Sequence, residues 1–283
     1  MFNEGQLVKK AEELRELIVK MLTTAGSGHV AGPMGSADFW VSLYFGDLIK
    51  LDANDPWHED RDRVVLSAGH YAPALYGVLA MKSFFPMSEL QTLRKLGTRL
   101  QGHPVAKLLP GVEVSSGPLG QGISQAVGMA LAAKMTKKNW RVICVMGDGE
   151  QQEGQVWEAY MSAAKYELDN LLIVVDRNNI QIDGFTEKVM PLEPLSEKYK
   201  AFNLHTLEVD GHNFRQIFEA FSRWKVNVGK PTVLILKTTP GRGVEFMENN
   251  AAWHGKAPSL PEAIEALQAL RKMRTLNSQI VND

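Results

Sequence analysis

Two apolar segments, each followed by a short polar turn, constrain the fold of this chain more than any other feature. The first runs from Val142 to Met146 and leads into Gly147-Asp148-Gly149, and the second runs from Leu171 to Val175 and leads to Asn178. A helix-forming stretch separates them, which is the pattern of a parallel strand–helix–strand unit. Because the carboxyl ends of such strands meet at one edge of the sheet, we expect Asp148 and Asn178 to face one crevice.

The residue types at these two turns suit a divalent cation shared with phosphate oxygens. Mg²⁺ and Ca²⁺ prefer hard oxygen ligands such as the Asp148 carboxylate and the Asn178 amide oxygen. The flanking glycines let the backbone approach closely, and a helix beginning after Gly149 would direct its first N–H groups at the same anion. A Gly-Asp-Gly turn alone is more often an ordinary turn, so it is the pair of turns that indicates a binding site.

Glycine-rich stretches elsewhere in the chain carry four histidines. These stretches are Ser27-Gly28-His29, Gly69-His70, Gly102-His103-Pro104 and Trp253-His254-Gly255. Glycine at this density costs backbone entropy, which is acceptable where a chain packs closely around a ligand. His29 by itself could equally be a surface residue, and we expect its loop, Ala25 to Gly35, to add little to the core. Residues Gly117 to Gly122 are too apolar for a solvent loop and would let the backbone approach a flat ring.

The alternation of apolar and helical segments predicts an α/β fold, a single doubly wound domain with a mainly parallel sheet of about five strands. We expect the strands at 64–67, 142–146, 171–176, 204–209 and 232–237. Residues 71–98 are predicted to form two helices, and 186–200 a loop without periodicity. We expect residues 1–283 to be one domain, with a helical N-terminal segment at 1–60 and a C-terminal helix at 260–275.

Charge and cysteine content exclude several classes of partner and site. The chain has 31 basic and 32 acidic residues and a formal charge of −1, so we expect no nucleic acid or acidic membrane partner. No apolar run approaches the about 20 residues of a membrane-spanning helix. The single cysteine, Cys144, lies within an apolar strand and is interpreted as a small buried hydrophobe. Without a disulfide in the chain, we expect a cytoplasmic protein.

Laid out in order, these motifs resemble the transketolase family over nearly the whole chain. Gly147-Asp148-Gly149, 28 intervening residues and then Asn178 resemble the thiamine diphosphate fingerprint of that family. The other motifs, in the order of the family's amino-terminal, diphosphate-binding half, are Ser27-Gly28-His29, Pro33-Met34-Gly35, Asp60-Arg61-Asp62-Arg63, Gly69-His70, Gly102-His103-Pro104, Gly117-Pro118-Leu119-Gly120-Gln121-Gly122, Glu153-Gly154 and Trp253-His254-Gly255. The chain departs from the family at Val30-Ala31, where Pro-Gly is usual, and at Asn179, where many members have glycine. The first departure could reshape the wall beside His29 and alter the substrate range.

The resemblance implies thiamine diphosphate anchored by Mg²⁺, with Ca²⁺ or Mn²⁺ as alternatives. Carried over by position, the metal ligands are Asp148, Asn178 and the carbonyl of Ile180. Residues implied to contact the cofactor are His70, Gly117, Leu119, Gly147, Gly149 and Ile182, with Gly117 and Leu119 against the aminopyrimidine. Glu153 resembles a buried acid near the subunit interface that couples two cofactor sites.

The implied reaction is the transfer of a two-carbon ketol unit from a ketose phosphate to an aldose phosphate. Proton transfer on sugar hydroxyls needs groups that titrate near neutrality, a task that suits histidine. By position, His29 and His254 handle the donor C3 hydroxyl and the acceptor aldehyde oxygen. His103 hydrogen-bonds the C1 hydroxyl, and His70 lies beside the diphosphate.

A second subunit is also implied by the resemblance. In this family the glutamate that faces the aminopyrimidine and the arginines that grip the sugar phosphate belong to another α/β domain. No second sheet can be built from the residues left here. We therefore expect a separately encoded C-terminal transketolase subunit, the pyrimidine-binding half, in an α₂β₂ heterotetramer with two sites.

Other interpretations stay open at this point. A transketolase-like enzyme for an unusual sugar phosphate fits the same motifs. 1-Deoxy-xylulose-5-phosphate synthase shares the central fingerprint but fits the run from Asp60 to His70 and the Trp253-His254-Gly255 region less well. An inactive scaffold or regulatory binding subunit would not need Asp148, Asn178 and four loop histidines. A nucleotide-binding protein without thiamine would need glycine signatures that are missing here.

Overall fold

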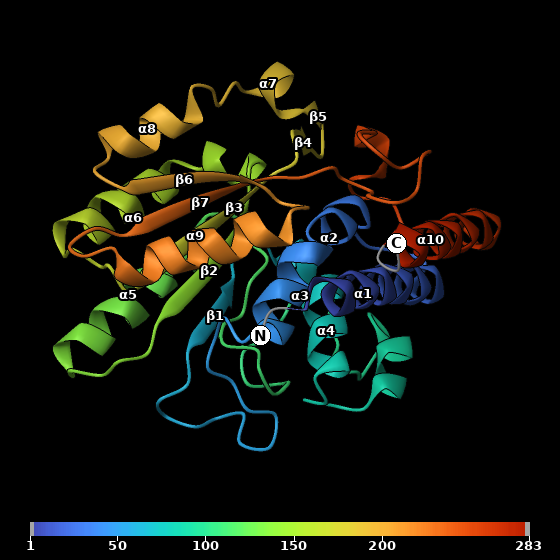
Figure 1. Ribbon diagram of the computed structural model, residues 1–283, viewed down its shortest axis with the longest axis horizontal. Helices are drawn as coiled ribbons and strands as arrows, with labels where there is room; N and C mark the ends of the chain where they lie inside the picture. Colours follow the sequence, from blue (N-terminus) through green and yellow to red (C-terminus); the bar gives the residue numbers. More distant parts are fainter. Residues whose placement is uncertain (1–2, 281–283) are drawn as a thin grey trace.

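A parallel sheet of five strands forms the centre of the molecule in this computed structural model, which describes the backbone of residues 3–280 and the side chains of residues 3–275 (Figure 1). In spatial order the strands are β1 (Arg63–Leu66), β2 (Val142–Gly147), β3 (Leu171–Arg177), β7 (Thr232–Lys237) and β6 (His205–Asp210). All four neighbouring pairs are parallel. The predicted fold class is thereby confirmed, and each strand ends within one residue of its expected bounds.

Residues of β2 and β3 are buried along the whole length of both strands. Such continuous apolar runs are typical of parallel strands that are covered on both faces. Their register pairs Gly147 with Asp176. The turn that carries Asp148 therefore starts beside the turn that carries Asn178, as the strand–helix–strand pattern predicts.

Helices cover both faces of the sheet and create two apolar clusters. The apolar cluster on one face also includes residues of α1 (Glu4–Ala25), α2 (Ala31–Gly35), α3 (Ala37–Phe45), α4 (Ala72–Met81), α9 (Phe214–Val226) and α10 (Leu260–Ile280). The other packs against α5 (Gln121–Met135), α6 (Gly154–Lys165) and α8 (Leu195–Ala201). Successive strand residues alternate between the clusters: Ile143 and Val145 lie in the first, while Cys144 lies in the second. Cys144 is a buried free thiol, in agreement with its interpretation as a hydrophobe.

The segment predicted as a loop at 186–200 contains two helices, α7 (Thr186–Val189) and α8. That prediction was wrong because α8 buries only Leu195 and Tyr199, four residues apart, while its other positions are polar or small. Two apolar residues one helical turn apart are too few to show a helical period in the sequence. The second helix expected within 71–98 is a 3₁₀ helix, Met87–Thr92.

The expectation for the glycine-rich loop from Ala25 to Gly35 was also wrong in part. Its second half folds as α2, and Val30, Ala31 and Met34 are fully buried. Small residues are needed here for close packing, since a Cβ at Gly32 would come within 2.5 Å of the Tyr71 ring. Val30-Ala31 therefore changes the core behind His29, and neither residue forms part of the wall of the site.

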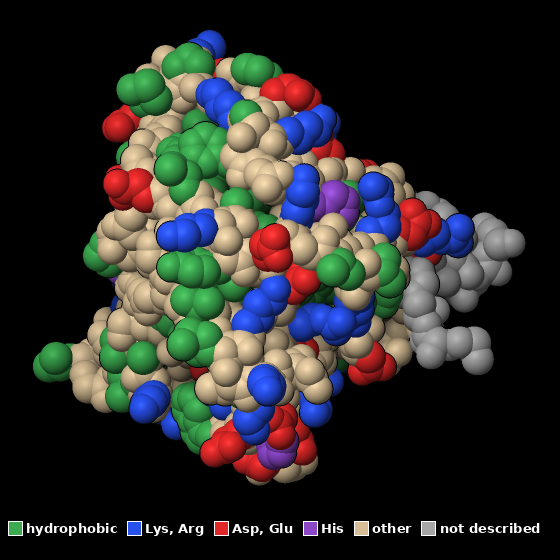
Figure 2. Space-filling view, turned by 90° about the vertical axis from the view of Figure 1, so that its left-hand side faces the viewer, with side chains coloured by type: hydrophobic (Ala, Val, Ile, Leu, Met, Phe, Trp, Pro, Cys, Tyr) green, Lys and Arg blue, Asp and Glu red, His purple; other side chains and the backbone are tan. Residues whose placement is uncertain are grey.

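Charged side chains of both signs are interspersed on the face drawn in Figure 2, and no continuous basic tract crosses it. A nucleic-acid-binding face would concentrate Lys and Arg. Among the described residues, no helix combines the length and the apolarity that crossing a membrane requires.

Candidate functional site

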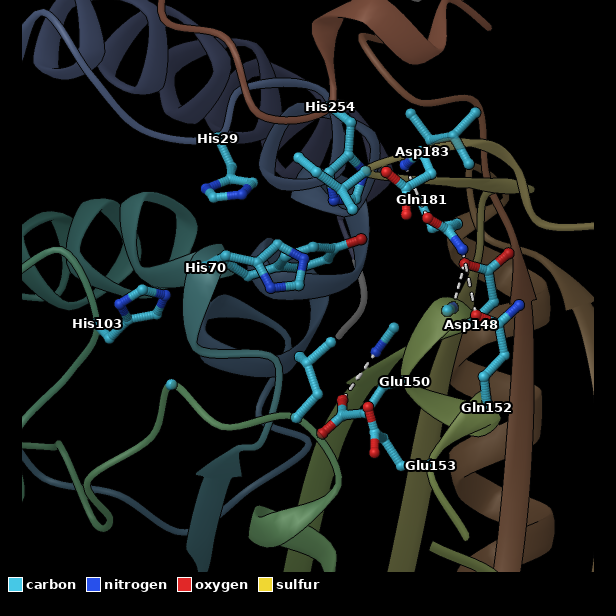
Figure 3. A pocket seen from close by; sticks show the side chains of 17 residues that line it. His29, His70, His103, Asp148, Glu150, Gln152, Glu153, Gln181, Asp183 and His254 are labelled. Atoms are coloured by element: carbon cyan, nitrogen blue, oxygen red, sulfur yellow. Dashed lines mark hydrogen bonds between the residues drawn. The ribbon is translucent and has the colours of Figure 1, made fainter. Parts of the chain in front are cut away.

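A cavity of about 370 Å³ opens at the carboxyl ends of β1, β2 and β3. The predicted site residues that line it are His29, His70, His103, Gly117, Leu119, Gly147, Asp148, Gly149, Glu153, Ile180, Ile182 and His254. Asn178, the remaining predicted residue, lies buried beneath this lining. Figure 3 shows the labelled histidines on one side of the cavity and Asp148 with Gln152, Gln181 and Asp183 on the other. Segments that are far apart in the sequence thus meet in one place.

Three imidazoles form a compact cluster on the histidine side. Ring centroids of His29 and His70 are 4.9 Å apart, those of His29 and His254 are 5.5 Å apart, and those of His70 and His254 are 5.4 Å apart. Each ring comes from a different segment: His29 precedes α2, His70 follows β1, and His254 follows the 3₁₀ helix Ala251–Trp253. The cluster therefore exists only in the folded chain.

All three clustered histidines favour the neutral imidazole. Burial, with the charges of His254, His103 and Arg94, lowers the pKa of His29 to about 4, and burial lowers the pKa of His254 to about 4. Burial also holds the pKa of His70 well below its usual value. A neutral imidazole has one donor and one acceptor nitrogen. The Nδ1 of His254 is buried and has no hydrogen-bond partner within the described part of the chain, so it is free to bond a ligand.

We expect His29 and His254 to destabilise the fold as the pH falls from about 6.5 to about 4. In this window the unfolded chain binds protons at His29 and His254, whereas the folded chain does not, so acid favours unfolding. Allowing for partial exposure of both rings, each contributes about 1–2 kcal/mol. Urea denaturation at pH 7 and pH 4.5 measures the difference. The variant His254→Asn should lose less stability between these two pH values than the wild type, and an equal loss would contradict the expectation.

Asp148 lies at the tip of β2 in a dense set of hydrogen bonds. Its Oδ2 accepts from Arg177 Nη1 at 2.8 Å, from Asn179 N at 2.8 Å and from Thr186 Oγ1 at 3.2 Å, while its Oδ1 accepts from Gly149 N at 2.8 Å. Asn179 reaches the carboxylate from a left-handed backbone with φ of 64°. Asparagine adopts that conformation more readily than most residues, which explains how it replaces the family's glycine.

A buried network fixes the orientation of Asn178. Its Nδ2 donates to Asp176 Oδ2 at 2.7 Å and to the Tyr71 hydroxyl at 2.8 Å, and the same Asp176 oxygen accepts from the Tyr71 hydroxyl at 2.5 Å. Thr238 Oγ1 donates to the other oxygen of Asp176. The Asn178 amide nitrogen donates to both Asp176 and Tyr71, so the amide oxygen points the other way, toward the turn at Ile180. There it accepts a hydrogen bond from Ile180 N at 3.1 Å.

These residues fit a divalent cation that is also bound by a diphosphate. Burial raises the pKa of Asp148 to about 6, despite the opposing effect of Arg177, and a cation beside the carboxylate would relieve that desolvation cost. No three His, Cys, Asp or Glu residues within the described part of the chain converge into a metal cluster. A cation at Asp148 would therefore need oxygens from amide and carbonyl groups and from the ligand itself.

Glu150 holds the glycine-rich turn 117–122, part of which lines the cavity. Its Oε1 accepts from Gly120 N at 2.7 Å and from the Ser67 hydroxyl, and Ser67 Oγ accepts from Gly122 N at 3.1 Å. A Cβ at Gly122 would come within 2.5 Å of the Ser67 side chain. The tips of β1 and β2 therefore clamp this turn, so that Gly117 and Leu119 line the cavity.

A second buried network joins the segment after His29 to the segment that follows β7. Asp38 Oδ2 accepts from Arg15 Nη2 at 2.5 Å and pairs with His212 Nδ1 at 2.7 Å, and His212 Nε2 accepts from Thr239 N at 2.8 Å. Gly241 N, after β7, donates to Ala31 O at 2.9 Å. The start of α2, two residues after His29, is thus tied to the segment that follows β7.

Sequence reasoning missed several residues that line the cavity. Tyr71, Glu150, Gln152, Gln181 and Asp183 also line the cavity. Tyr71 and Glu150 directly follow predicted motifs, which is a usable signal, whereas nothing in the sequence marks Gln152 or Gln181. Glu153, which is expected to be buried near a subunit interface, is exposed in the single chain.

Comparison with known proteins agrees with this geometry. Residues 7–277 match the family described as transketolase, thiamine diphosphate binding domain. The chain is 42% identical over 248 residues to the 6-deoxy-6-sulfo-D-fructose transketolase subunit of Clostridium sp. strain MSTE9, covering 88% of this chain and 90% of that protein. It is 39% identical over 259 residues to an apulose-4-phosphate transketolase subunit of Phocaeicola vulgatus, covering 92% of each.

Solved structures give the same result for the fold. The transketolase of Leishmania mexicana superimposes with a TM-score of 0.86 at 29% identity, over 96% of this chain and 45% of that one. The transketolase of Campylobacter jejuni superimposes with a TM-score of 0.84 at 29% identity, over 98% of this chain and 48% of that one. The chain spans about half the length of these transketolases.

Proposed function

This chain belongs to the transketolase thiamine diphosphate-binding domain family, and we propose on that basis that it is the amino-terminal subunit of a two-subunit transketolase. The enzyme would transfer a two-carbon ketol unit from a ketose phosphate to an aldose phosphate. One observation carries the proposal: the Asp148 and Asn178 turns and the four predicted histidines come together around one cavity. A scaffold would have no use for neutral imidazoles grouped beside a buried carboxylate.

A second class of sugar substrate is also a candidate. The two relatives above are named for a sulfonated fructose and for apulose-4-phosphate. These names favour a modified or branched sugar as an alternative substrate class for this chain. Assays with ordinary ketose phosphates and with sulfonated or branched ones would decide between the two classes.

The cofactor side of the cavity would bind thiamine diphosphate and its cation through this chain's own oxygen ligands. Asp148, Asn178 and the Ile180 carbonyl would hold Mg²⁺, Ca²⁺ or Mn²⁺, and His70, Gly147 and Gly149 would lie against the diphosphate. When bound, thiamine diphosphate supplies the electron sink for the two-carbon unit. Detection of thiamine diphosphate by mass spectrometry after denaturing the purified protein would test this assignment directly.

The histidine side would handle the protons of the sugar. A neutral His29 or His254 can take the proton from the donor C3 hydroxyl at its free ring nitrogen and return it to the acceptor aldehyde oxygen. Their ring centroids lie 5.5 Å apart, so both can reach one sugar chain. His103 would hydrogen-bond the C1 hydroxyl. Glu153, exposed here, would become buried where two subunits meet.

Replacing His29 or His254 with alanine should lower kcat/KM by about 10²–10⁴, because each variant loses a group that moves a proton in the transition state. Steady-state kinetics of the assembled enzyme measure the loss, and calorimetry should show unchanged affinity for thiamine diphosphate. His58→Ala serves as control, since His58 is exposed and lies outside the lining of the cavity. If both site variants had wild-type kinetics, the proton-transfer role proposed for His29 and His254 would be wrong.

The partner would be a separately encoded C-terminal subunit that supplies the pyrimidine-binding half, in a heterotetramer with two sites. Relatives named as subunits match this chain over nearly their full length, which supports that arrangement. A buried free cysteine fits a reducing compartment, so we place the enzyme in the cytoplasm.

A further inference from the structure

Arg177, the last residue of β3, places a buried positive charge directly beside the carboxylate proposed to bind the cation. Its Nη1 donates to Asp148 Oδ2 at 2.8 Å, and only 5% of the Arg177 side chain is exposed. The guanidinium does not itself line the cavity, so it contacts Asp148 from the protein side. Because arginine stays protonated in proteins, this charge is present whether or not a cation is bound.

The two oxygens of the Asp148 carboxylate are used unequally. Oδ2 accepts from Arg177, from Asn179 N at 2.8 Å and from Thr186 Oγ1 at 3.2 Å. Oδ1 accepts from Gly149 N at 2.8 Å. An ionised carboxylate offers about two acceptor positions on each oxygen. The protein therefore occupies Oδ2 fully, whereas Oδ1 keeps a position for a cation.

Two further carboxylates hold the guanidinium in this place. Arg177 Nη2 pairs with Glu187 at 2.6 Å and with Glu193 at 3.0 Å. Glu187 belongs to α7 and accepts from Leu192 N at 3.0 Å, so this acid is itself fixed in the segment that follows β5. The arginine is thus anchored independently of Asp148. A cation that bound to Asp148 would meet a positive charge that the protein holds in position.

We propose that Arg177 is a built-in counterion that competes with the divalent cation for Asp148 and thereby sets the cation affinity of the site. Without a cation, the guanidinium pairs with a buried carboxylate that would otherwise be unpaired, a state that is strongly destabilising. With a cation bound, two positive groups share one carboxylate, and their repulsion in a buried site weakens cation binding. This assignment rests on the cation site of the proposed function and adds a residue that lies behind the lining of the cavity.

The test titrates Mn²⁺ alone into the full chain, without cofactor or partner, and follows the paramagnetic broadening of the His70 ring signals by NMR. His70 and Asp148 line the same cavity, so a Mn²⁺ ion at this carboxylate should broaden these signals. Arg177→Gln removes the charge and should lower the Mn²⁺ concentration for half-maximal broadening by about 5–50-fold. In Asp148→Asn the broadening at these concentrations should disappear, which identifies the carboxylate as the binding site.

Two controls separate the effect of charge from support of the turn that carries Asp148. Arg177→Lys keeps the charge but loses the planar fork, so its Mn²⁺ affinity should stay close to that of the wild type. Arg61→Gln removes the same charge from another arginine that pairs with a carboxylate, Glu113 at 2.8 Å. Arg61 precedes β1, at the end of the sheet opposite the cavity, and its replacement should leave the Mn²⁺ affinity unchanged.

Equal or weaker Mn²⁺ binding in Arg177→Gln would overturn the proposal, because the arginine would then only support the turn. Equally tightened binding in Arg177→Lys would also overturn it, since charge would not be the cause. If thermal unfolding showed that Arg177→Gln does not fold, Glu187→Gln decides instead. It removes a charge that offsets Arg177 and should weaken Mn²⁺ binding by about two- to fivefold, and an unchanged affinity would contradict the proposal.

The same titration distinguishes this proposal from the proposed reaction. If Mn²⁺ did not broaden the His70 signals of the wild-type chain, the cation site and the role of Arg177 would fail together. If Mn²⁺ binding followed the expected order among the variants but the assembled enzyme transferred no ketol unit, only the proposed reaction would be wrong.

Discussion

Replacing Asp148 with asparagine should weaken the binding of thiamine diphosphate in the presence of Mg²⁺ by more than about 100-fold. Even the outer partners of metal ligands typically contribute about 10–100-fold to affinity, and a direct carboxylate ligand should contribute more. Asparagine preserves the shape of the side chain but removes the charge that neutralises the cation. Isothermal titration calorimetry with and without Mg²⁺ measures the change.

The fold should survive this substitution. Arg177, which loses one partner, keeps ion pairs to Glu187 at 2.6 Å and to Glu193 at 3.0 Å. Asp169→Asn is the matched control, since Asp169 precedes β3 at the end of the strand opposite the cavity. Thermal unfolding should show both variants to be folded. Undiminished Mg²⁺-dependent affinity in Asp148→Asn would refute the assignment of this carboxylate as a metal ligand.

The chain without its partner should show little or no ketol transfer, and activity should saturate near an equimolar ratio when the partner subunit is added. In the proposed arrangement this chain supplies the diphosphate side and the histidine side, and the acid that acts on the aminopyrimidine belongs to the partner subunit. Activity measured across a titration, with the mass of the complex from analytical ultracentrifugation, tests both the requirement and the stoichiometry.

A matched control separates assembly from catalysis. The Asp148→Asn chain should still form the complex with the partner, because the ligand turn lies inside the cavity, yet the complex should be inactive. Full turnover by the purified wild-type chain with no second subunit present would contradict the two-subunit proposal.

The sheet was predictable because its central strands are apolar along their whole length and buried on both faces. Val142–Met146 and Leu171–Val175 have no polar position that would suggest another kind of element, and turn residues bound them on each side. Helix α8 was missed since only Leu195 and Tyr199 of its residues are buried. Short elements that depend on tertiary contacts leave little periodicity to read.

The residues of the site were predictable from the sequence, but the hydrogen bonds that hold them in place were not. Glycine-flanked histidines and the Asp148 turn stand out in the sequence, and all of them line the cavity. The bond between Tyr71 and Asp176 spans 105 positions and depends on the register of β1, β2 and β3.

The small hairpin after β3 narrows the rim of the cavity at one point. Ile182, between β4 (Ile180–Gln181) and β5 (Gly184–Phe185), is 65% exposed, and a Cβ at Gly255 would come within 2.8 Å of its Cδ1. At this point the rim is narrowed by one aliphatic side chain that faces a residue with none. Rotamer changes of exposed side chains take picoseconds to nanoseconds, whereas loop displacements that gate other enzymes take microseconds or longer. A rotamer change of Ile182 alone would therefore widen the rim at this point, with no displacement of the backbone.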